Sequence, residues 1–382
     1  MLSLVSKFEK RLIDNNFRLE VLNNFAQVCD FSHNRFLSLD NVARDIKEYL
    51  VSDGVNIVIA NGEFIADLSN YDLLKNLTNE QGEVASSLFA HNEQHLLNCL
   101  SIEVSAGKKL NIIYWFDDSL QTDAVYNLRQ ILHIKSKDKV DCREIFINAG
   151  KKVKYINLVM DYSIASHAKL ELSQEHIKSK NLVVWQTHRV NLGESSLYAR
   201  LDWFVNSLIS LVHQNISFKG NNSECIINNA SDIADYQRFS NLVNIEHSGK
   251  NCKSTQNFCA AAKSQGIGII KSKVVIDKLA NKSEANQILR GLLLDDSSSL
   301  MMSPELEIDN DDVACYHGAS VGSLDKEGLV YLKARGFSEA QAQMVMMEAL
   351  FKQLACGFDK SLFATNMMLL QHKWQGSAYV CV

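Results

Sequence analysis

The chain has 382 residues, a net charge of −5, 46% hydrophobic and 22% charged residues, a composition typical of a globular protein with a substantial core. It contains no apolar run near the roughly 20 residues that a membrane-spanning helix needs, and no dense basic cluster of the kind that marks nucleic-acid-binding proteins. Four of the first twelve residues are charged, with no apolar run behind them, and the nine scattered cysteines form no CxxC pair. We therefore expect no signal peptide, a reducing compartment and a cytoplasmic protein.

Residues 1–100 are predicted to be helical apart from one hairpin. Apolar residues recur at roughly helical spacing over 8–50 and again over 71–100. Between these stretches, two β-rich runs in residues 55–68 flank the dipeptide Asn61-Gly62. Both residues tolerate positive φ, so the dipeptide favours a type I′ hairpin turn.

Residues 101–322 have a different pattern, with short strand-like runs separated by Asn, Ser, Asp and Gly. This pattern predicts an all-β body, with two exceptions: Thr122 to Ile131 also fits a short helix, and Ala230 to Leu242 is ambiguous. A sandwich, a barrel and a stacked solenoid all satisfy it. The length favours a solenoid, because a solenoid grows by adding turns that cover each other's edges, but the repeat is too irregular to decide.

Residues 323–382 are predicted to be helical again. One helix is expected to end at Gly336, and Ser338 with Gln341 matches a capping box at the start of the next. That helix carries a stripe assigned to the core, made of Ala342, Val345, Met346, Ala349, Leu350 and Leu354. The opposite side carries further apolar residues and one acid, which we interpret as a partner-docking surface: Met344, Met347, Glu348 and Phe351.

Cys315 and His317 are the candidate metal ligands of the chain. They lie two residues apart in a strand-like run, so alternation places both side chains on one face. A thiolate and an imidazole suit iron or an iron–sulfur cluster, and a partner would have to complete the ligand set. The alternative is a packed cysteine beside a hydrogen-bonded histidine.

Other candidate groups carry weaker signals. Asp309, Asp311 and Asp312 fit a metal-binding turn but more often form a solvated one. His91 and His95 lack a third ligand, and Cys252 and Cys259 are interpreted as buried thiols. The chain has no GxxxxGK[ST] phosphate loop and no convincing nucleophile triad, so we expect no enzyme activity from it alone.

The segment from Met302 to Gly322 resembles a signature of the SufB/SufD family, the scaffold subunits of the SUF iron–sulfur assembly system. The matching residues are Pro304-x-Leu306-Glu307-Ile308, then Asp311-Asp312-Val313-x-Cys315-x-His317-Gly318-Ala319-x-Val321-Gly322. Upstream, Gln287 and Arg290 occupy a similar Gln-x-x-Arg-x-Leu-Leu-Leu run. SufB-type chains carry Glu-His-Glu around this histidine, whereas this chain has Tyr316-His317-Gly318, so the resemblance is to SufD-type members.

The resemblance implies a mainly β fold, with a right-handed parallel β-helix core flanked by N-terminal and C-terminal helical regions. The expected regions are 1–100, 101–322 and 323–382. It also implies a non-catalytic scaffold that pairs with a SufB-type subunit and binds a SufC-type ATPase through its C-terminal helices, with a homodimer as the alternative state in isolation. An iron–sulfur cluster would be held transiently at the subunit interface through Cys315 and His317.

Two other functions are consistent with the residues. A purely structural adaptor would keep the helices and the partner surface, and the Cys315–His317 pair would have no role in metal binding. A β-helix carbohydrate-active enzyme is the second alternative, because fold alone does not exclude it. That enzyme would need a carboxylate pair or a calcium groove, in a class of proteins that is usually secreted.

Overall fold

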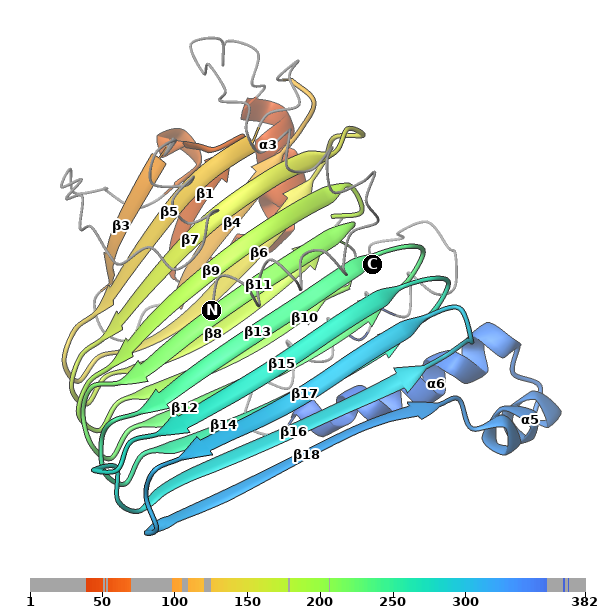
Figure 1. The fold of residues 1–382 in the computed structure, drawn as a ribbon. Coiled ribbons are helices and arrows are strands. Elements are labelled where there is room, and N and C mark those ends of the chain that lie inside the picture. Colours follow the sequence, from red (N-terminus) through yellow and green to blue (C-terminus); the bar gives the residue numbers. More distant parts are fainter. Residues whose placement is uncertain are drawn as a thin grey trace.

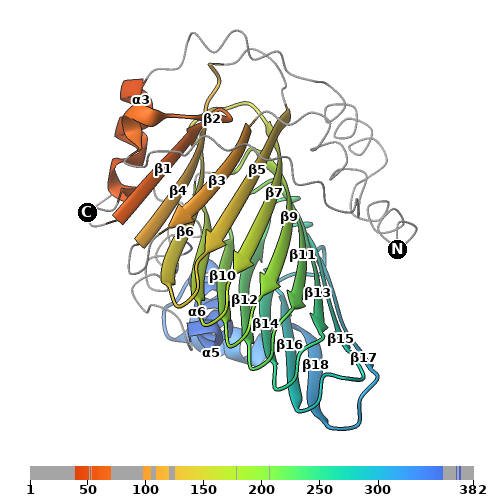
Figure 2. The same ribbon diagram turned by 90° about the vertical axis from the view of Figure 1, so that its left-hand side faces the viewer.

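The computed structural model describes residues 39–50, 52, 54–69, 98–104, 109–119, 125–177, 179–205, 207–355, 367 and 370. Two parallel sheets face each other and form a β-helix, in which the chain alternates between the sheets as it advances (Figures 1 and 2). One strand from each sheet makes one turn of the helix, called a rung below. The predicted mainly β fold with a parallel β-helix core is confirmed, and the structure selects the solenoid among the three architectures.

The larger sheet has ten strands and begins with a hairpin. In spatial order its strands are β2 (Glu63–Phe64), β1 (Gly54–Ala60), β4 (Lys109–Phe116), β6 (Lys139–Asn148), β8 (Lys169–Ile177), β10 (Leu197–Phe204), β12 (Glu224–Ile233), β14 (Lys253–Ala262), β16 (Ser283–Leu293) and β18 (Val313–Ser323). Apart from the antiparallel pair β1–β2, all neighbours in this sheet are parallel.

The smaller sheet has eight strands, all parallel. In order they are β3 (Asn98–Val104), β5 (Val125–Ile134), β7 (Lys154–Ile164), β9 (Leu182–Leu192), β11 (Ile209–Phe218), β13 (Arg238–His247), β15 (Ile267–Ile276) and β17 (Ser299–Ile308). In the stretch Thr122 to Ile131, which also fitted a helix, the described residues from Val125 onward belong to β5. Its β-branched and aromatic residues extend a ladder between β3 and β7, and this tertiary pairing overrides the local ambiguity.

In successive rungs, side chains of the same kind lie above one another. Alternate residues point between the two sheets, where they form one continuous apolar core. On the outer faces, asparagines pair across neighbouring strands at matching register positions. Their amides hydrogen-bond from Asn157 to Asn127 at 2.9 Å, from Asn244 to Asn215 at 3.1 Å and from Asn257 to Asn228 at 2.9 Å.

The predicted hairpin is present, and its turn has the expected geometry. Ile59 pairs with Phe64 and Ala60 with Glu63, while Asn61 and Gly62 have φ values of 47° and 85°, as a type I′ turn requires. The first hairpin strand, β1, also pairs in parallel with β4 over its whole length. The hairpin therefore forms the beginning of the larger sheet.

Short helices occur near both ends of the described part of the chain. The N-terminal ones are α3 (Leu39–Ile46) and the 3-10 turns η1 (Lys47–Tyr49) and η2 (Ala66–Leu68); the C-terminal ones are α5 (Lys326–Ala334), α6 (Glu339–Phe351) and the 3-10 turn η3 (Lys352–Ala355). The capping box at Ser338 and Gln341 is confirmed, and Gly336 follows α5 with a φ of 92°.

Several helical predictions lie outside the described residues. They are the helices expected within 8–38 and 71–97, and most of the segment 361–371. The limits of the three expected regions, 1–100, 101–322 and 323–382, stay predictions.

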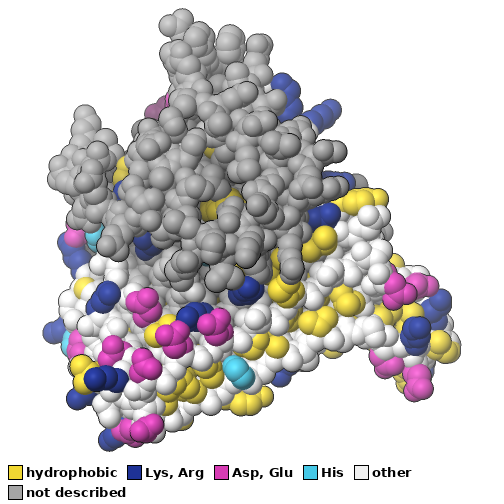
Figure 3. Space-filling view, viewed as in Figure 1, with side chains coloured by type: hydrophobic (Ala, Val, Ile, Leu, Met, Phe, Trp, Pro, Cys, Tyr) yellow, Lys and Arg dark blue, Asp and Glu magenta, His cyan; other side chains and the backbone are white. Residues whose placement is uncertain are grey.

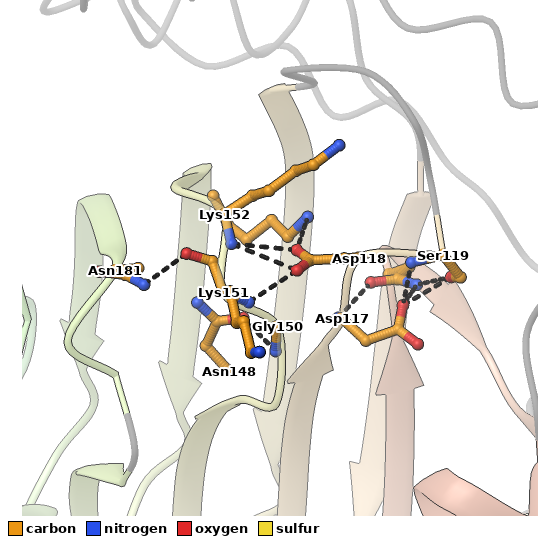
Figure 4. A network of polar contacts seen from close by, with 10 residues as sticks. Asp117, Asp118, Ser119, Asn148, Gly150, Lys151, Lys152 and Asn181 are labelled. Carbon is orange, nitrogen blue, oxygen red and sulfur yellow. Dashed lines mark hydrogen bonds and ion pairs between the residues drawn. The ribbon is translucent and has the colours of Figure 1, made fainter.

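A polar cluster around Asp118 joins two rungs near the N-terminal end of the β-helix (Figure 4). The Asp118 carboxylate follows β4 and accepts hydrogen bonds from the backbone N–H groups of Lys151, at 2.7 Å, and Lys152, at 3.2 Å. It also forms an ion pair with the Lys154 ammonium at 3.0 Å. Burial alone would raise the pKa of Asp118, but these three partners outweigh it and lower the pKa below its ordinary value.

Replacement of Asp118 by alanine is expected to lower the free energy of unfolding by about 1–2 kcal/mol at pH 7, because two backbone donors and one ammonium lose a charged acceptor. A carboxyl with a lowered native pKa contributes stability above its unfolded value, and this contribution is lost as the pH falls through the native one. In urea titrations, the difference from the unmodified chain should therefore shrink below about pH 4. The exposed Asp296, replaced by alanine, is the control; an equal effect of both substitutions would contradict the assignment.

Candidate functional site

The last rung of the β-helix consists of β17 and β18. Each is the final strand of its sheet, so one edge of each carries backbone groups that no described strand pairs. Several large apolar side chains of this rung are exposed: Met301, Ile308, Tyr316 and Val321. An unpaired edge together with exposed apolar side chains is the arrangement of a surface that another chain can cover.

Cys315 and His317 both lie on the inner face of β18. Cys315 is in register with Ala285 of β16, and His317 is in register with Gln287. Both β16 residues are fully buried, and partners in parallel strands point their side chains to the same side. The predicted common face of the pair is thus the inner face, at the open end of the β-helix.

The two side chains differ in exposure. Cys315 is half-buried and packs against the apolar core, whereas His317 is exposed because no described rung follows it. Burial raises the pKa of the Cys315 thiol, and a backbone hydrogen bond with Ala285 opposes that rise only in part. The thiol must therefore lose its proton when it binds a metal or a cluster.

At this end of the β-helix, the described residues bring together only the two candidate ligands, Cys315 and His317. Among the described residues, no group of three or more His, Cys, Asp and Glu side chains is placed to hold a metal ion. Asp309, Asp311 and Asp312 lie in the exposed turn between β17 and β18. There the Asp312 backbone N–H donates to the Asn310 side chain at 2.8 Å, as in an ordinary polar turn.

The predicted core stripe of α6 is only partly correct: Ala342 and Leu354 are buried as predicted, but the structure also buries most of the face expected to be exposed. Met344, Met347 and Phe351, expected on the exposed side, are buried against the outer face of the larger sheet, where Phe351 packs edge-on against Trp203 with ring centroids 6.0 Å apart. Val345, expected in the core, is 39% exposed. The helix is apolar on every side, so its periodicity could not decide which side the sheet would cover.

Glu348 lies at the border of the buried face. Its side chain is 18% exposed and pairs with Lys352 at 3.9 Å. The ATPase-contact role of Met344, Met347, Glu348 and Phe351 stays a prediction. Burial of the three apolar residues means that, with α6 docked as it is, only Glu348 of the four is within a partner's reach.

A different apolar surface on the C-terminal helices was not predicted. None of the residues in α5 is buried, and large apolar side chains are exposed on this helix, on the turn after it and on α6: Val330, Tyr331, Phe337 and Val345. Of the two helices, α5 projects beyond the strands, and apolar and charged side chains lie side by side on the protruding surface (Figures 1 and 3). The signal in the sequence was a short helix without an apolar stripe that could face a core.

The remaining candidates have structural surroundings or lie outside the described residues. The Cys252 thiol donates to the Gly220 carbonyl oxygen at 3.3 Å, and the Cys259 thiol donates to the Leu350 carbonyl oxygen at 3.6 Å. Both cysteines are buried, as predicted. His91 and His95 fall among residues that the structure does not describe.

Comparison with known proteins identifies the family. The family model for the SufBD core domain of SUF system FeS cluster assembly matches residues 118–350, which include the last rung with Cys315 and His317. The chain belongs to the SufBD family.

Named relatives refine the assignment. The chain is 28% identical over 239 residues to the iron–sulfur cluster assembly protein SufD of Plasmodium falciparum, a match that covers 60% of this chain and 16% of that protein. It is 30% identical over 110 residues to SufD of Escherichia coli, covering 29% and 26%, and 32% identical over 91 residues to the chloroplastic protein ABCI7 of Arabidopsis thaliana, covering 24% and 19%. This chain is thus a SufD-type member of the SufBD family.

The matched segments span about a sixth of the Plasmodium protein and about a quarter of the Escherichia protein. The resemblance stated from the sequence is confirmed at the level of the family and the SufD type. In the part of the chain that the structure describes, no helix is long and apolar enough to cross a membrane. Cytoplasmic localisation stays a prediction, since one relative is named as chloroplastic.

Proposed function

We propose that this chain is a non-catalytic scaffold subunit, whose last rung contributes Cys315 and His317 to a site where an iron–sulfur cluster is assembled as cargo. The observation that carries the proposal is the position of this pair. Both side chains face the open end of the β-helix, in a strand with an unpaired edge. Two ligands leave an iron site incomplete, so a second polypeptide must supply the others.

The partner at this end is a SufB-type subunit. Its own terminal strand would pair with the edge of β18 or β17 and cover the exposed apolar side chains of the last rung. An isolated chain would satisfy the same edge by forming a homodimer. The family membership supports this assignment, because the SUF system assembles clusters with SufBD-core proteins.

The partner of the C-terminal helices is a SufC-type ATPase, which would supply the nucleotide hydrolysis for which this chain has no phosphate loop. The exposed apolar side chains of α5 and α6 suit such a contact, because large apolar patches on a surface mark interaction sites. Affinity purification of the full-length chain from its native cell, with identification of the co-eluting proteins, tests both partners. Recovery of the chain without either a SufB-type or a SufC-type protein would contradict the proposal.

Replacement of His317 by alanine is expected to reduce the cluster yield at least several-fold in an anaerobically reconstituted complex, while subunit pairing stays intact. The side chain is exposed and lies on the inner face, so its loss removes a ligand without opening a cavity in the core. Absorbance and Mössbauer spectra measure the cluster, and size-exclusion chromatography measures the pairing. Replacement of the exposed His133 in β5 is the control, and an unchanged cluster yield with His317→Ala would remove the site.

A purely structural adaptor is the second candidate, and one observation favours it. Cys315 is half-buried, packs against the apolar core and has a raised pKa, as a packing thiol would. Replacement of Cys315 by serine separates the two functions. A scaffold ligand predicts a loss of cluster yield, whereas a packing thiol predicts a small loss of stability with the yield unchanged.

A further inference from the structure

The interior of the β-helix contains a group of fully buried polar side chains midway along its axis. They belong to the middle rungs and come from both sheets: Gln186, His188, Asp202, Gln214, Asn229 and Asn241, each 0% exposed. We call this group the central polar cluster. Register places its members on neighbouring strands, because His188 pairs with Gln214 across β9 and β11, and Asp202 pairs with Asn229 across β10 and β12.

Four members are held in place by hydrogen bonds with other side chains of the protein. One Asp202 oxygen accepts a hydrogen bond from Arg200 at 2.7 Å, and Gln214 Nε2 donates to Asn241 Oδ1 at 3.2 Å. The Asn229 carbonyl oxygen accepts from the Ser231 hydroxyl at 2.7 Å. These bonds fix the side chains, so their second polar atoms cannot turn away to other groups without breaking them.

Those second polar atoms have no partner in the protein. They are Asp202 Oδ2, Gln214 Oε1, Asn229 Nδ2, Asn241 Nδ2, both ring nitrogens of His188 and both side-chain amide atoms of Gln186. A buried polar atom without a hydrogen bond is strongly disfavoured, and native proteins pair nearly all of them with the protein or with ordered water. So many in one place indicate a site that binds something.

The mixture of donors and acceptors identifies the ligand. Asp202 Oδ2 and Gln214 Oε1 need donors, whereas the two asparagine nitrogens need acceptors, and a neutral imidazole needs one of each. An anion would satisfy only the donors and would be repelled by Asp202, and a cation would be repelled by Arg200. Water both donates and accepts, and a buried water typically makes about three hydrogen bonds.

We infer that the central polar cluster binds a group of ordered water molecules inside the β-helix. The inference does not depend on the proposed role in cluster assembly. The hydrated interior explains how a core otherwise filled with apolar side chains accommodates the Arg200–Asp202 ion pair.

A high-resolution crystal structure of the full-length chain tests the site directly. We expect ordered water density within hydrogen-bonding distance of His188 and Gln186. Direct hydrogen bonds among the six side chains, with no water between them, would overturn the inference.

Replacement of Gln186 by methionine tests the same site in solution. This residue is chosen because neither of its amide atoms has a protein partner. If water binds there, the apolar side chain leaves that water and its other partners short of hydrogen bonds, and the melting temperature falls. If the interior is dry, removal of an unpartnered amide removes a penalty, so an unchanged or raised melting temperature would overturn the inference.

The matched control is Leu158→Met. Leu158 is the register partner of Gln186 in the neighbouring strand β7, is fully buried and is apolar. The substitution introduces the same side chain one rung away without removing a polar group, so only a small shift of the melting temperature is expected. Should Gln186→Met fail to fold, oxygen-17 relaxation dispersion on the unmodified chain still counts long-lived buried waters. A measurement that detects no such waters would overturn the inference.

Discussion

Replacement of Arg200 by leucine is expected to lower the free energy of unfolding by about 3–5 kcal/mol, since removal of one partner of a buried ion pair leaves an uncompensated charge. Both side chains of the Arg200–Asp202 pair are 0% exposed, and their atoms lie 2.7 Å apart. Arg200 also donates to the side chains of Gln174 and Tyr198. Without the guanidinium, all three partners lose a charged donor inside the β-helix.

The loss of unfolding free energy in Arg200→Leu should depend on pH in a defined direction. Burial raises the pKa of Asp202 although Arg200 opposes it, and burial likewise raises the pKa of Glu144. Removal of the Arg200 charge should raise both pKa values further, because it removes an attraction that favours the ionised carboxylates. A carboxyl whose native pKa exceeds its unfolded one binds a proton on folding, so stability falls as the pH rises. The defect of Arg200→Leu relative to the unmodified chain is therefore expected to be larger at pH 7.5 than at about pH 5.

The double substitution Arg200→Leu with Asp202→Leu is the control. Replacement of a buried ion pair by apolar side chains is often close to neutral, so the double variant should be more stable than Arg200→Leu alone. Urea titrations at both pH values give the coupling energy. Additive losses in the double variant would show that the pair does not act as a unit.

The strands were easier to predict than their arrangement. Alternation along a strand is local, so the common face of Cys315 and His317 followed from two residues of sequence. The solenoid did not follow, because its evidence is spread over successive rungs. Asn127 and Asn157 are 30 residues apart, and Asn228 and Asn257 are 29 apart. This spacing of like residues was the signal that would have selected a stacked structure over a sandwich.

Residues that depend on tertiary contacts were predicted less well. The polar interior was not anticipated, since Arg200 and Asp202 alternate with apolar residues as they would on a solvent-facing strand. The outer face of β10, with Leu201 and Trp203, is instead the side that α6 covers. The local pattern therefore distinguished the two faces of β10 but could not show that neither of them meets water.

The same ambiguity in α6 leads to a prediction about its docking. Replacement of Phe351 by aspartate is expected to release α6 from the sheet, because it removes an aromatic side chain that is 0% exposed and buries a charge in its place. Loss of the phenyl group alone costs about 3–5 kcal/mol, and an unpaired buried carboxylate adds to that. Hydrogen exchange of the α6 amides in the full-length chain should then be faster, while exchange in β5 to β9 stays unchanged.

Replacement of Val345 by aspartate is the matched variant on the exposed side of the same helix. Val345 is 39% exposed, so the folded chain should lose less than about 0.5 kcal/mol of stability. If the exposed apolar side chains of α5 and α6 bind the ATPase, this charge should still reduce co-purification several-fold, because it places a carboxylate in an apolar contact. Intact co-purification with Val345→Asp, together with its loss in Phe351→Asp without release of α6, would instead assign the contact to the buried face. In that case α6 would have to leave the sheet in order to bind.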